Sequence, residues 1–212
     1  MGICDSTKNE NEKPQPYRNP FESPTDRINK QVEKCLCKID NGNGTFRSGF
    51  LVKFPTSKRT ISAICSSYNA TNYQQIASTG IINFTLNNDQ IVKNININDS
   101  REKFLLPESN IAMIEIIPAK DGIYDFLEVE PNLNKLNAGQ QVYILHYIDG
   151  KTGTCSSGQL LNVCNPLLEY SVTTSETSTG GPICLTDTQR VIGVHLAKVG
   201  FNSGKGTFFK VP

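Results

Sequence analysis

The sequence lacks any long run of like charge and any long apolar stretch. Its 212 residues carry 21 basic and 20 acidic side chains, which are spread along the chain. Binding to nucleic acid needs clustered Lys and Arg to neutralise phosphates, so we do not expect it. No apolar run approaches the roughly 20 residues that cross a bilayer, and the first residues lack the apolar core of a secretory signal. We therefore expect neither a membrane-spanning protein nor an exported one.

The cysteines also lack a metal-binding pattern. Seven are present, and no pair has the C-x₂₋₄-C spacing that is typical of zinc sites. A zinc site built from Cys155, Cys164, Cys184 and His146 is conceivable, but free cysteines are more commonly small buried side chains. We expect thiols in a reducing cytosol, with no metal and no cofactor.

The first six residues fit a lipidation pattern. Gly2 follows the initiator Met, and Ser6 occupies the position where N-myristoylation requires a hydroxyl. A single myristoyl chain binds a membrane only marginally, so stable anchoring needs a second signal. Cys4 is placed to supply it by S-palmitoylation. The sequence therefore predicts a chain that is lipid-anchored at the cytoplasmic face of a membrane, or otherwise cytosolic.

A polar segment follows these residues. Residues 7 to 28 are rich in Pro, Asn and charge and poor in apolar side chains. Such a segment cannot offset its ordering entropy by burial, so we predict a flexible tether over residues 1–30. Asn29 to Lys34 are expected to form a helical turn that leads into the folded body.

From Cys35 onward the pattern predicts β-structure throughout. Short runs rich in Val, Ile, Phe and Tyr alternate with turn residues, and no segment holds a helical apolar period for ten residues. The turns are expected at 41–44, 87–89, 149–150 and 204–206. The expected strands are Cys35–Ile39, Gly49–Phe54, Ile61–Cys65, Ile81–Leu86, Ile111–Ile117, Gln141–Leu145, Gln159–Val163, Val191–Leu196 and Thr207–Val211. Many short strands with regular turns indicate one or two β-barrels or sandwiches.

Segments in this body resemble the trypsin-like serine peptidase superfamily, and most of all its intracellular single-chain members. The matching segments are Ser48–Val52, Thr60–Cys65, Ser109–Ile116, Thr177–Ile183 and Val191–His195. The fourth of these resembles the family's nucleophile turn, G-x-S-G-G-P. The resemblance implies an all-β fold of two packed six-stranded Greek-key β-barrels with a cleft between them. We expect the barrels to cover residues 31–122 and 123–212.

The resemblance also implies that the catalytic triad is degenerate. A hydroxyl nucleophile needs an imidazole base, and that base needs a carboxylate to orient it. The residues at the base, orienting and nucleophile positions are Cys65, Asn110 and Thr179. A thiol is a poor base near neutral pH, an amide carries no charge, and the threonine methyl group crowds the attack path.

The resemblance places further residues around the cleft. The oxyanion donors would be the N–H groups of Thr177 and Thr179, and the first replaces a family glycine. His195 would line the specificity pocket with Thr173 or Thr174, where family members read a Glu or Gln side chain. The other histidine, His146, is expected to be structural. A dyad of Cys65 and His195 would need an atypical cleft.

Three functions are open at this point. The first is an inactive peptidase homologue, or pseudopeptidase, that is tethered to a membrane and binds a protein or an extended peptide in the cleft by strand addition. The second is an active but atypical serine-type endopeptidase that uses Thr179. The third is a structural protein that keeps the fold and uses another surface.

Overall fold

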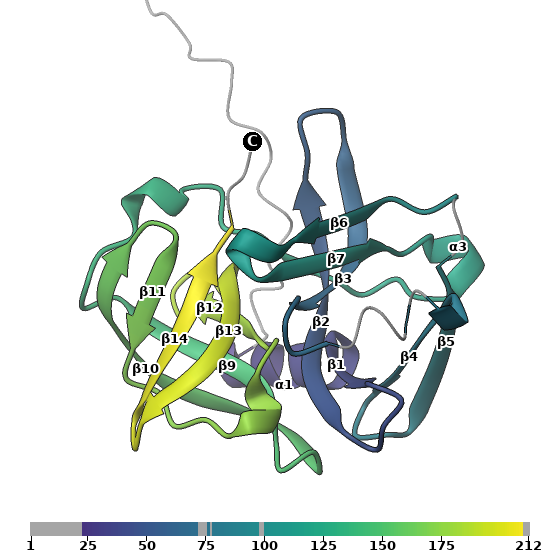
Figure 1. Cartoon of the computed structure of the whole chain (residues 1–212). Coiled ribbons are helices and arrows are strands. Elements are labelled where there is room, and N and C mark those ends of the chain that lie inside the picture. Colours follow the sequence, from purple (N-terminus) through teal and green to yellow (C-terminus); the bar gives the residue numbers. More distant parts are fainter. Residues whose placement is uncertain (1–22, 72–75, 77, 98–99, 210–212) are drawn as a thin grey trace, which may run out of the picture.

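The computed structural model describes residues 23–71, 76, 78–97 and 100–209, in which two β-units lie side by side (Figure 1). Gly2, Cys4 and Ser6 lie outside the described residues, so the lipidation pattern stays a prediction. Within the described part, no helix is both long and apolar enough to span a bilayer.

Helix α1 (Pro24–Lys34) begins earlier than the sequence pattern predicts. The Ser23 hydroxyl accepts a hydrogen bond from the backbone N–H of Asp26, and Pro24 occupies the first helical position. Both features are typical of a helix start. The flexible tether predicted over residues 1–30 is therefore wrong for residues 24–30, which are helical, and the helical turn expected from Asn29 to Lys34 is part of a longer helix. Gln31 then anchors the helix, because it accepts from the Tyr143 hydroxyl at 2.7 Å and donates to the Gln189 carbonyl.

The first unit is an eight-stranded sheet with the order β5-β4-β1-β2-β3-β7-β6, and β8 pairs in parallel with β2. Its strands are β1 (Leu36–Asp40), β2 (Phe46–Pro55), β3 (Thr60–Ser67), β4 (Ile81–Leu86), β5 (Ile91–Asn96), β6 (Lys103–Leu106), β7 (Ile111–Glu115) and β8 (Leu127–Glu128). In the described residues the sheet curls into a half-barrel, with eight strands where six were expected, and this is consistent with the first of the two predicted β-barrels. Strand β8 lies beyond the expected boundary at residue 122, because Leu127 pairs with Val52.

The second unit is a closed six-stranded barrel, as predicted, with the order β10-β11-β14-β13-β12-β9. Its strands are β9 (Gln141–Ile148), β10 (Thr152–Cys164), β11 (Leu167–Tyr170), β12 (Pro182–Leu185), β13 (Val191–Gly200) and β14 (Ser203–Phe208). Short helices connect the strands: η1 (Pro107–Ser109), α3 (Pro118–Asp121), η2 (Leu133–Lys135) and η3 (Glu176–Ser178).

One turn prediction is wrong. Gly204, Lys205 and Gly206 lie inside β14, not in a turn. A Cβ atom at Gly204 would collide with the side chain of Tyr170, and one at Gly206 with that of Ile183. These glycines therefore permit close packing across the barrel. The strand therefore begins at Ser203, earlier than the expected Thr207.

Strand β9 belongs to two cores at once. Its side chains alternate, so Tyr143, Leu145 and Tyr147 join the core shared with the first sheet. Ile144 of the same strand packs in the interior of the second barrel. This shared core fixes the two units against each other and so determines the shape of the cleft between them.

Candidate functional site

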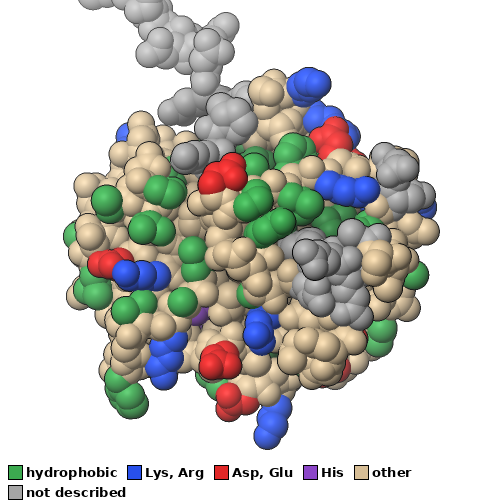
Figure 2. Space-filling view, in the orientation of Figure 1, with side chains coloured by type: hydrophobic (Ala, Val, Ile, Leu, Met, Phe, Trp, Pro, Cys, Tyr) green, Lys and Arg blue, Asp and Glu red, His purple; other side chains and the backbone are tan. Residues whose placement is uncertain are grey.

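A cavity of about 650 Å³ lies between the two units. The first sheet contributes Arg47, Ser67, Asn69, Ala70 and Asn110, and the second barrel contributes Glu176, Thr179 and residues 196–200. Figure 2 shows this face of the molecule, where acidic and basic side chains stand close together between the two halves. The structure therefore brings Asn110 and Thr179 to one cavity, as the resemblance implies.

Cys65 is not at this cavity. It lies within β3, fully buried, opposite Phe50 on one neighbouring strand and Met113 on the other. Burial raises the pKa of its thiol well above the usual value. Strand β3 continues to Ser67, and it is Ser67 at the end of the strand, with Asn69 and Ala70 in the following turn, that lines the cavity. The expectation that Cys65 stands at the base position is thus corrected, because its thiol is buried in the core and does not line the cavity.

Asn110 holds that turn in place. Its Oδ1 accepts hydrogen bonds from the backbone N–H of Asn69 at 2.7 Å and from the Ser67 hydroxyl at 3.0 Å. The residue has a left-handed backbone with φ of 52°, a conformation that Asn tolerates better than most residues. Asn110 therefore orients a backbone turn where the family orients an imidazole.

The Thr179 hydroxyl is bonded to the backbone. Its Oγ1 donates to the carbonyl of Leu196 at 3.3 Å. Its main-chain carbonyl accepts from the N–H of Ser48 at 3.1 Å, a contact that crosses between the two units. No ring nitrogen of either histidine hydrogen-bonds the hydroxyl.

The expected oxyanion position is closed. The backbone N–H of Thr179 donates to the carbonyl of Glu176 at 3.2 Å, inside helix η3, and so is not directed at the cavity. The Thr177 hydroxyl donates to the carbonyl of Tyr147 and accepts from the N–H of Gly150. An oxyanion site needs two preorganised donors that point to one place, and the Thr179 N–H is not one of them.

Gly180 fixes the turn against the first sheet. Its φ of 94° suits glycine, and a Cβ atom there would collide with the carbonyl of Ser48 and the hydroxyl of Ser66. The Ser48 hydroxyl donates to the carbonyl of Thr177 at 2.8 Å. Gly180 and Ser48 therefore hold this turn of the second barrel against the first sheet.

His146 lies inside the second barrel, fully buried on β9. Its Nδ1 hydrogen-bonds the Ser178 hydroxyl at 2.6 Å and its Nε2 hydrogen-bonds the Ser156 hydroxyl at 2.9 Å. Burial lowers the pKa of the imidazole to about 4, so the ring is neutral at pH 7. Both nitrogens are engaged, which is consistent with the expected structural role.

His195 is also fully buried, but one ring nitrogen lacks a partner. Its Nδ1 hydrogen-bonds the hydroxyl of Tyr170, and that hydroxyl donates to the carbonyl of Lys205 at 2.9 Å. A hydroxyl has one proton, so Nδ1 must be the donor and Nε2 must be the acceptor. Burial lowers the pKa of His195 to about 3, and no described residue bonds Nε2.

The two candidate threonines beside His195 differ in their bonding. Thr173 is exposed and its hydroxyl donates to the Asn202 side chain at 2.9 Å, at the tip of the β13–β14 hairpin. Thr174 is buried, and its hydroxyl has no partner among the described residues. Thr174 is thus the threonine with the unsatisfied hydroxyl, although neither it nor His195 lines the cavity.

The described residues contain no group of three His, Cys, Asp or Glu side chains that could hold a metal ion. Three of the cysteines considered for a zinc site differ in their burial: Cys184 is buried, Cys155 is half-buried and Cys164 is exposed.

Several residues that line the cavity were not identified from the sequence, namely Arg47, Ser67, Asn69, Ala70, Glu176 and Lys198. The polar run from Ser66 to Asn69 could have marked the true end of β3.

Comparison with solved structures identifies the fold. Deg5 matches with 14% identity over 85% of this chain and 87% of that chain, with a TM-score of 0.62. The serine endoprotease from Yersinia pestis matches with 11% identity and a TM-score of 0.66, over 88% of this chain and 62% of that chain. The inactive form of the Rv3671c protease matches with 14% identity and a TM-score of 0.60, over 84% of each chain. No family model and no curated protein matches the sequence. The chain has the fold of trypsin-like serine proteases. At these low sequence identities, the matches establish the fold alone.

Proposed function

We propose that this chain is an inactive peptidase homologue that binds an extended peptide in the cleft between its two units. The observation that carries the proposal is the edge of β13 at residues 196–200, which lines the cavity and which no described strand covers. A second observation is His195, a fully buried histidine whose Nε2 has no partner among the described residues, and a buried polar atom without a hydrogen bond is costly.

Inactivity is supported by the surroundings of Thr179. Its hydroxyl donates to a backbone carbonyl, its N–H is used within η3, and no histidine accepts its proton. The chain has only two histidines, and both have other hydrogen-bond partners. A hydroxyl without a base is a weak nucleophile.

The edge of β13 offers a place for a peptide backbone. Strand β12 pairs with β13 only up to Val194, and residues 196–200 pair with β14 on one side alone. In the described residues no strand covers their other edge, and these residues line the cavity. An extended peptide can add to such an edge through main-chain hydrogen bonds, which need no catalytic triad.

The tautomer of His195 favours an amide side chain over a carboxylate. Because Nε2 is an unprotonated acceptor, it needs a donor, and a glutamine side chain supplies one in its NH₂ group. The free hydroxyl of Thr174 can donate to the amide oxygen of the same side chain. A carboxylate would meet a lone pair at Nε2 instead of a proton.

The proposal includes a membrane location. Gly2 and Cys4 carry the myristoylation and palmitoylation pattern, and the two acyl chains together would suffice for anchoring. Mass spectrometry of the N-terminal peptide from cells tests this part, since each acyl group adds its own mass. An unmodified Gly2 and Cys4 would remove the location from the proposal without affecting the peptide site.

Peptide binding is tested by fluorescence anisotropy with the labelled peptide Val-Ala-Val-Gln-Ala-Ala and its glutamate counterpart at pH 7.5. We expect the glutamine peptide to bind more tightly. Thr174→Val should weaken it about fivefold through one lost hydrogen bond. Thr173→Val is the matched control, because that hydroxyl is bonded to Asn202, and it should leave affinity within about twofold. Equal binding of both peptides, or equal effects of both substitutions, would contradict the proposed pocket.

The second candidate is an atypical peptidase that uses Thr179, and it is favoured by the position of this hydroxyl on the cavity beside Asn110. A fluorophosphonate probe discriminates between the two. Labelling of Thr179 in the wild-type protein, absent in Thr179→Ala, would establish the enzyme. We expect no labelling.

A further inference from the structure

The hairpin between β13 and β14 ends in exposed apolar side chains. Phe201 is 84% exposed, the highest value among the large apolar side chains of the described residues, and Val199 is 56% exposed. The whole run from 197 to 202 is exposed to solvent. Apolar area gains free energy when it leaves water, so this tip favours a partner that covers it.

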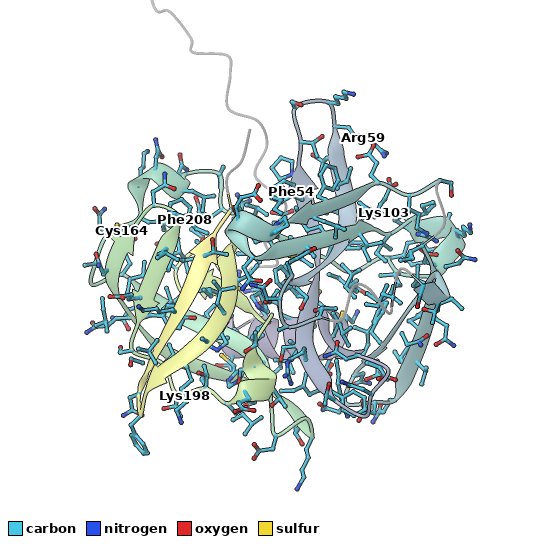
Figure 3. The ribbon with its side chains drawn as sticks, viewed as in Figure 1. Phe54, Arg59, Lys103, Cys164, Lys198 and Phe208 are labelled. Atoms are coloured by element: carbon cyan, nitrogen blue, oxygen red, sulfur yellow. The ribbon has the colours of Figure 1, made fainter. Side chains whose placement is uncertain are left out.

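The end of the hairpin projects from the barrel. Strand β12 pairs with β13 only up to Val194, and β11 pairs with β14 only from Gly204 onward. Between these limits the two strands pair with each other alone among the described strands, as Gly200 does with Ser203. The hairpin ends at the lower edge of the molecule in Figure 1, and Figure 3 labels Lys198 near this end. The tip is therefore placed to meet a flat surface.

The charge of the hairpin is positive. No acidic residue follows Asp187 in the sequence, while Lys198 and Lys205 both lie on the hairpin. Lys205 forms an ion pair with Glu169 at 3.4 Å. Lys198 forms no ion pair in the described part of the chain, and its ammonium group lies 6.0 Å from the ring centre of Phe201. An unpaired cation thus stands beside the most exposed ring.

A lipid bilayer matches these features better than a protein partner does. A stable protein interface covers about 800 Å² on each partner, and one ring with one valine offers much less. A bilayer needs no complementary shape, since it takes up an apolar side chain that reaches below its headgroups. A lysine beside the inserted ring keeps its ammonium group among the headgroups while its alkyl stem lies along the apolar layer. Anionic headgroups then attract the free charge of Lys198.

We propose that the tip of this hairpin, residues 198–202, is a contact site for an anionic lipid bilayer. Phe201 and Val199 enter the interfacial layer, and Lys198 binds the anionic headgroups. The contact depends neither on the proposed peptide site nor on acylation of Gly2 and Cys4. It is weak and reversible by itself, because so few apolar groups are buried, and it orients the folded body at a membrane surface.

The chain contains no tryptophan, so a single indole can report on the tip. Phe201→Trp places it there, and Tyr124→Trp is the matched control, because Tyr124 is an aromatic residue that is 70% exposed on the first unit. The full-length chain, produced without acylation and checked by mass, is mixed with vesicles of equal parts phosphatidylcholine and phosphatidylserine. We expect the emission of Phe201→Trp to shift to shorter wavelength and to be quenched by lipids with brominated acyl chains. Tyr124→Trp should show neither effect.

Co-sedimentation with the same vesicles measures what each side chain contributes in the otherwise unchanged protein. Phe201→Ser should weaken binding about tenfold, through the loss of one buried ring. Lys198→Gln should weaken it about fivefold, and should have no effect on vesicles of phosphatidylcholine alone. Lys58→Gln is the matched control for charge, because it removes an exposed lysine from the turn between β2 and β3. It should leave binding within about twofold.

Three results would overturn the proposal. The first is an unchanged emission of Phe201→Trp at every lipid concentration, and the second is an equal shift in Phe201→Trp and Tyr124→Trp. The third is a shift of Phe201→Trp that appears without vesicles as the protein concentration rises, which would show that the tip binds a second copy of the chain. Each of these leaves the peptide site untouched, because peptide binding is measured separately and without lipid.

Discussion

The side-chain oxygen of Asn110 lies 2.7 Å from the backbone nitrogen of Asn69 and accepts its hydrogen bond. This contact attaches the turn after β3 to the start of β7, and it brings Ala70 to the wall of the cavity. A side chain that faces the cavity therefore comes from this turn and not from position 65, which is buried in the core.

The first prediction follows from this placement. Ala70→His should be tolerated, because residue 70 is half-buried on a cavity of about 650 Å³. Cys65→His should lower the free energy of unfolding by more than about 3 kcal/mol, since it forces a larger polar ring into a filled core. Urea unfolding of the two variants measures the difference. Similar losses in both would show that position 70 is not the open one.

The second prediction concerns the oxyanion turn. The triple variant Ala70→His, Asn110→Asp, Thr179→Ser should remain unreactive to a fluorophosphonate probe, because the N–H at residue 179 still donates to the carbonyl of Glu176. Adding Thr177→Gly frees the backbone of η3 to turn this donor towards the cavity, and labelling should then appear. The same variant with Ser48→Ala added tests whether the turn also needs the hydrogen bond from the Ser48 hydroxyl to the Thr177 carbonyl. Labelling of the triple variant alone would contradict the closed-turn interpretation.

The third prediction tests the close approach at Gly180. Gly180→Ala should cost about 3 kcal/mol or more of unfolding free energy, because the new methyl group collides with the Ser48 carbonyl and the φ of 94° is strained for alanine. Gly139→Ala is the matched control: its φ of 88° is equally unfavourable, but no atom lies within 4 Å of the added methyl group. It should cost only about 1–2 kcal/mol. Equal losses would mean that backbone conformation alone explains the requirement for glycine.

The fourth prediction is a pH dependence that arises from the two buried histidines. Burial lowers the pKa of His146 to about 4 and that of His195 to about 3, against about 6.5 in an unfolded chain. Between these values the unfolded state binds protons that the folded state excludes, so stability falls as the pH drops below 6.5. The loss should be on the order of 2–3 kcal/mol for each histidine by pH 4.5.

Urea unfolding at pH 7.5, 6.5, 5.5 and 4.5 measures this dependence. His146→Gln should flatten it, because the variant has one titrating ring fewer. A stability that is constant between pH 7.5 and 4.5, or that rises as the pH falls, would contradict the assignment of both rings as neutral.

Much of the fold could be predicted from local pattern. The alternating runs of Val, Ile and Phe gave the correct positions of β2, β3, β4 and β9, since a half-buried strand needs this alternation. The strands β5 and β6 escaped prediction, because one is rich in asparagine and the other is only four residues long. Both are edge strands that pair with the adjacent strand in the sequence, β5 with β4 and β6 with β7, so their pairing and not their own apolar pattern makes them strands.

The sequence by itself determined that Thr179 follows a turn of the family's type, that Asn110 carries no charge and that only two histidines are available. Tertiary structure alone decided which residues share the cavity with Thr179. The register of β3 with β2 and β7 buries Cys65, so the cavity is lined by Ser67, Asn69 and Ala70 instead, and a shift along a strand cannot be read from its apolar pattern alone. The free nitrogen of His195 was likewise decided by packing, because the Tyr170 hydroxyl and the Lys205 carbonyl that fix its tautomer come from two other strands of the closed barrel.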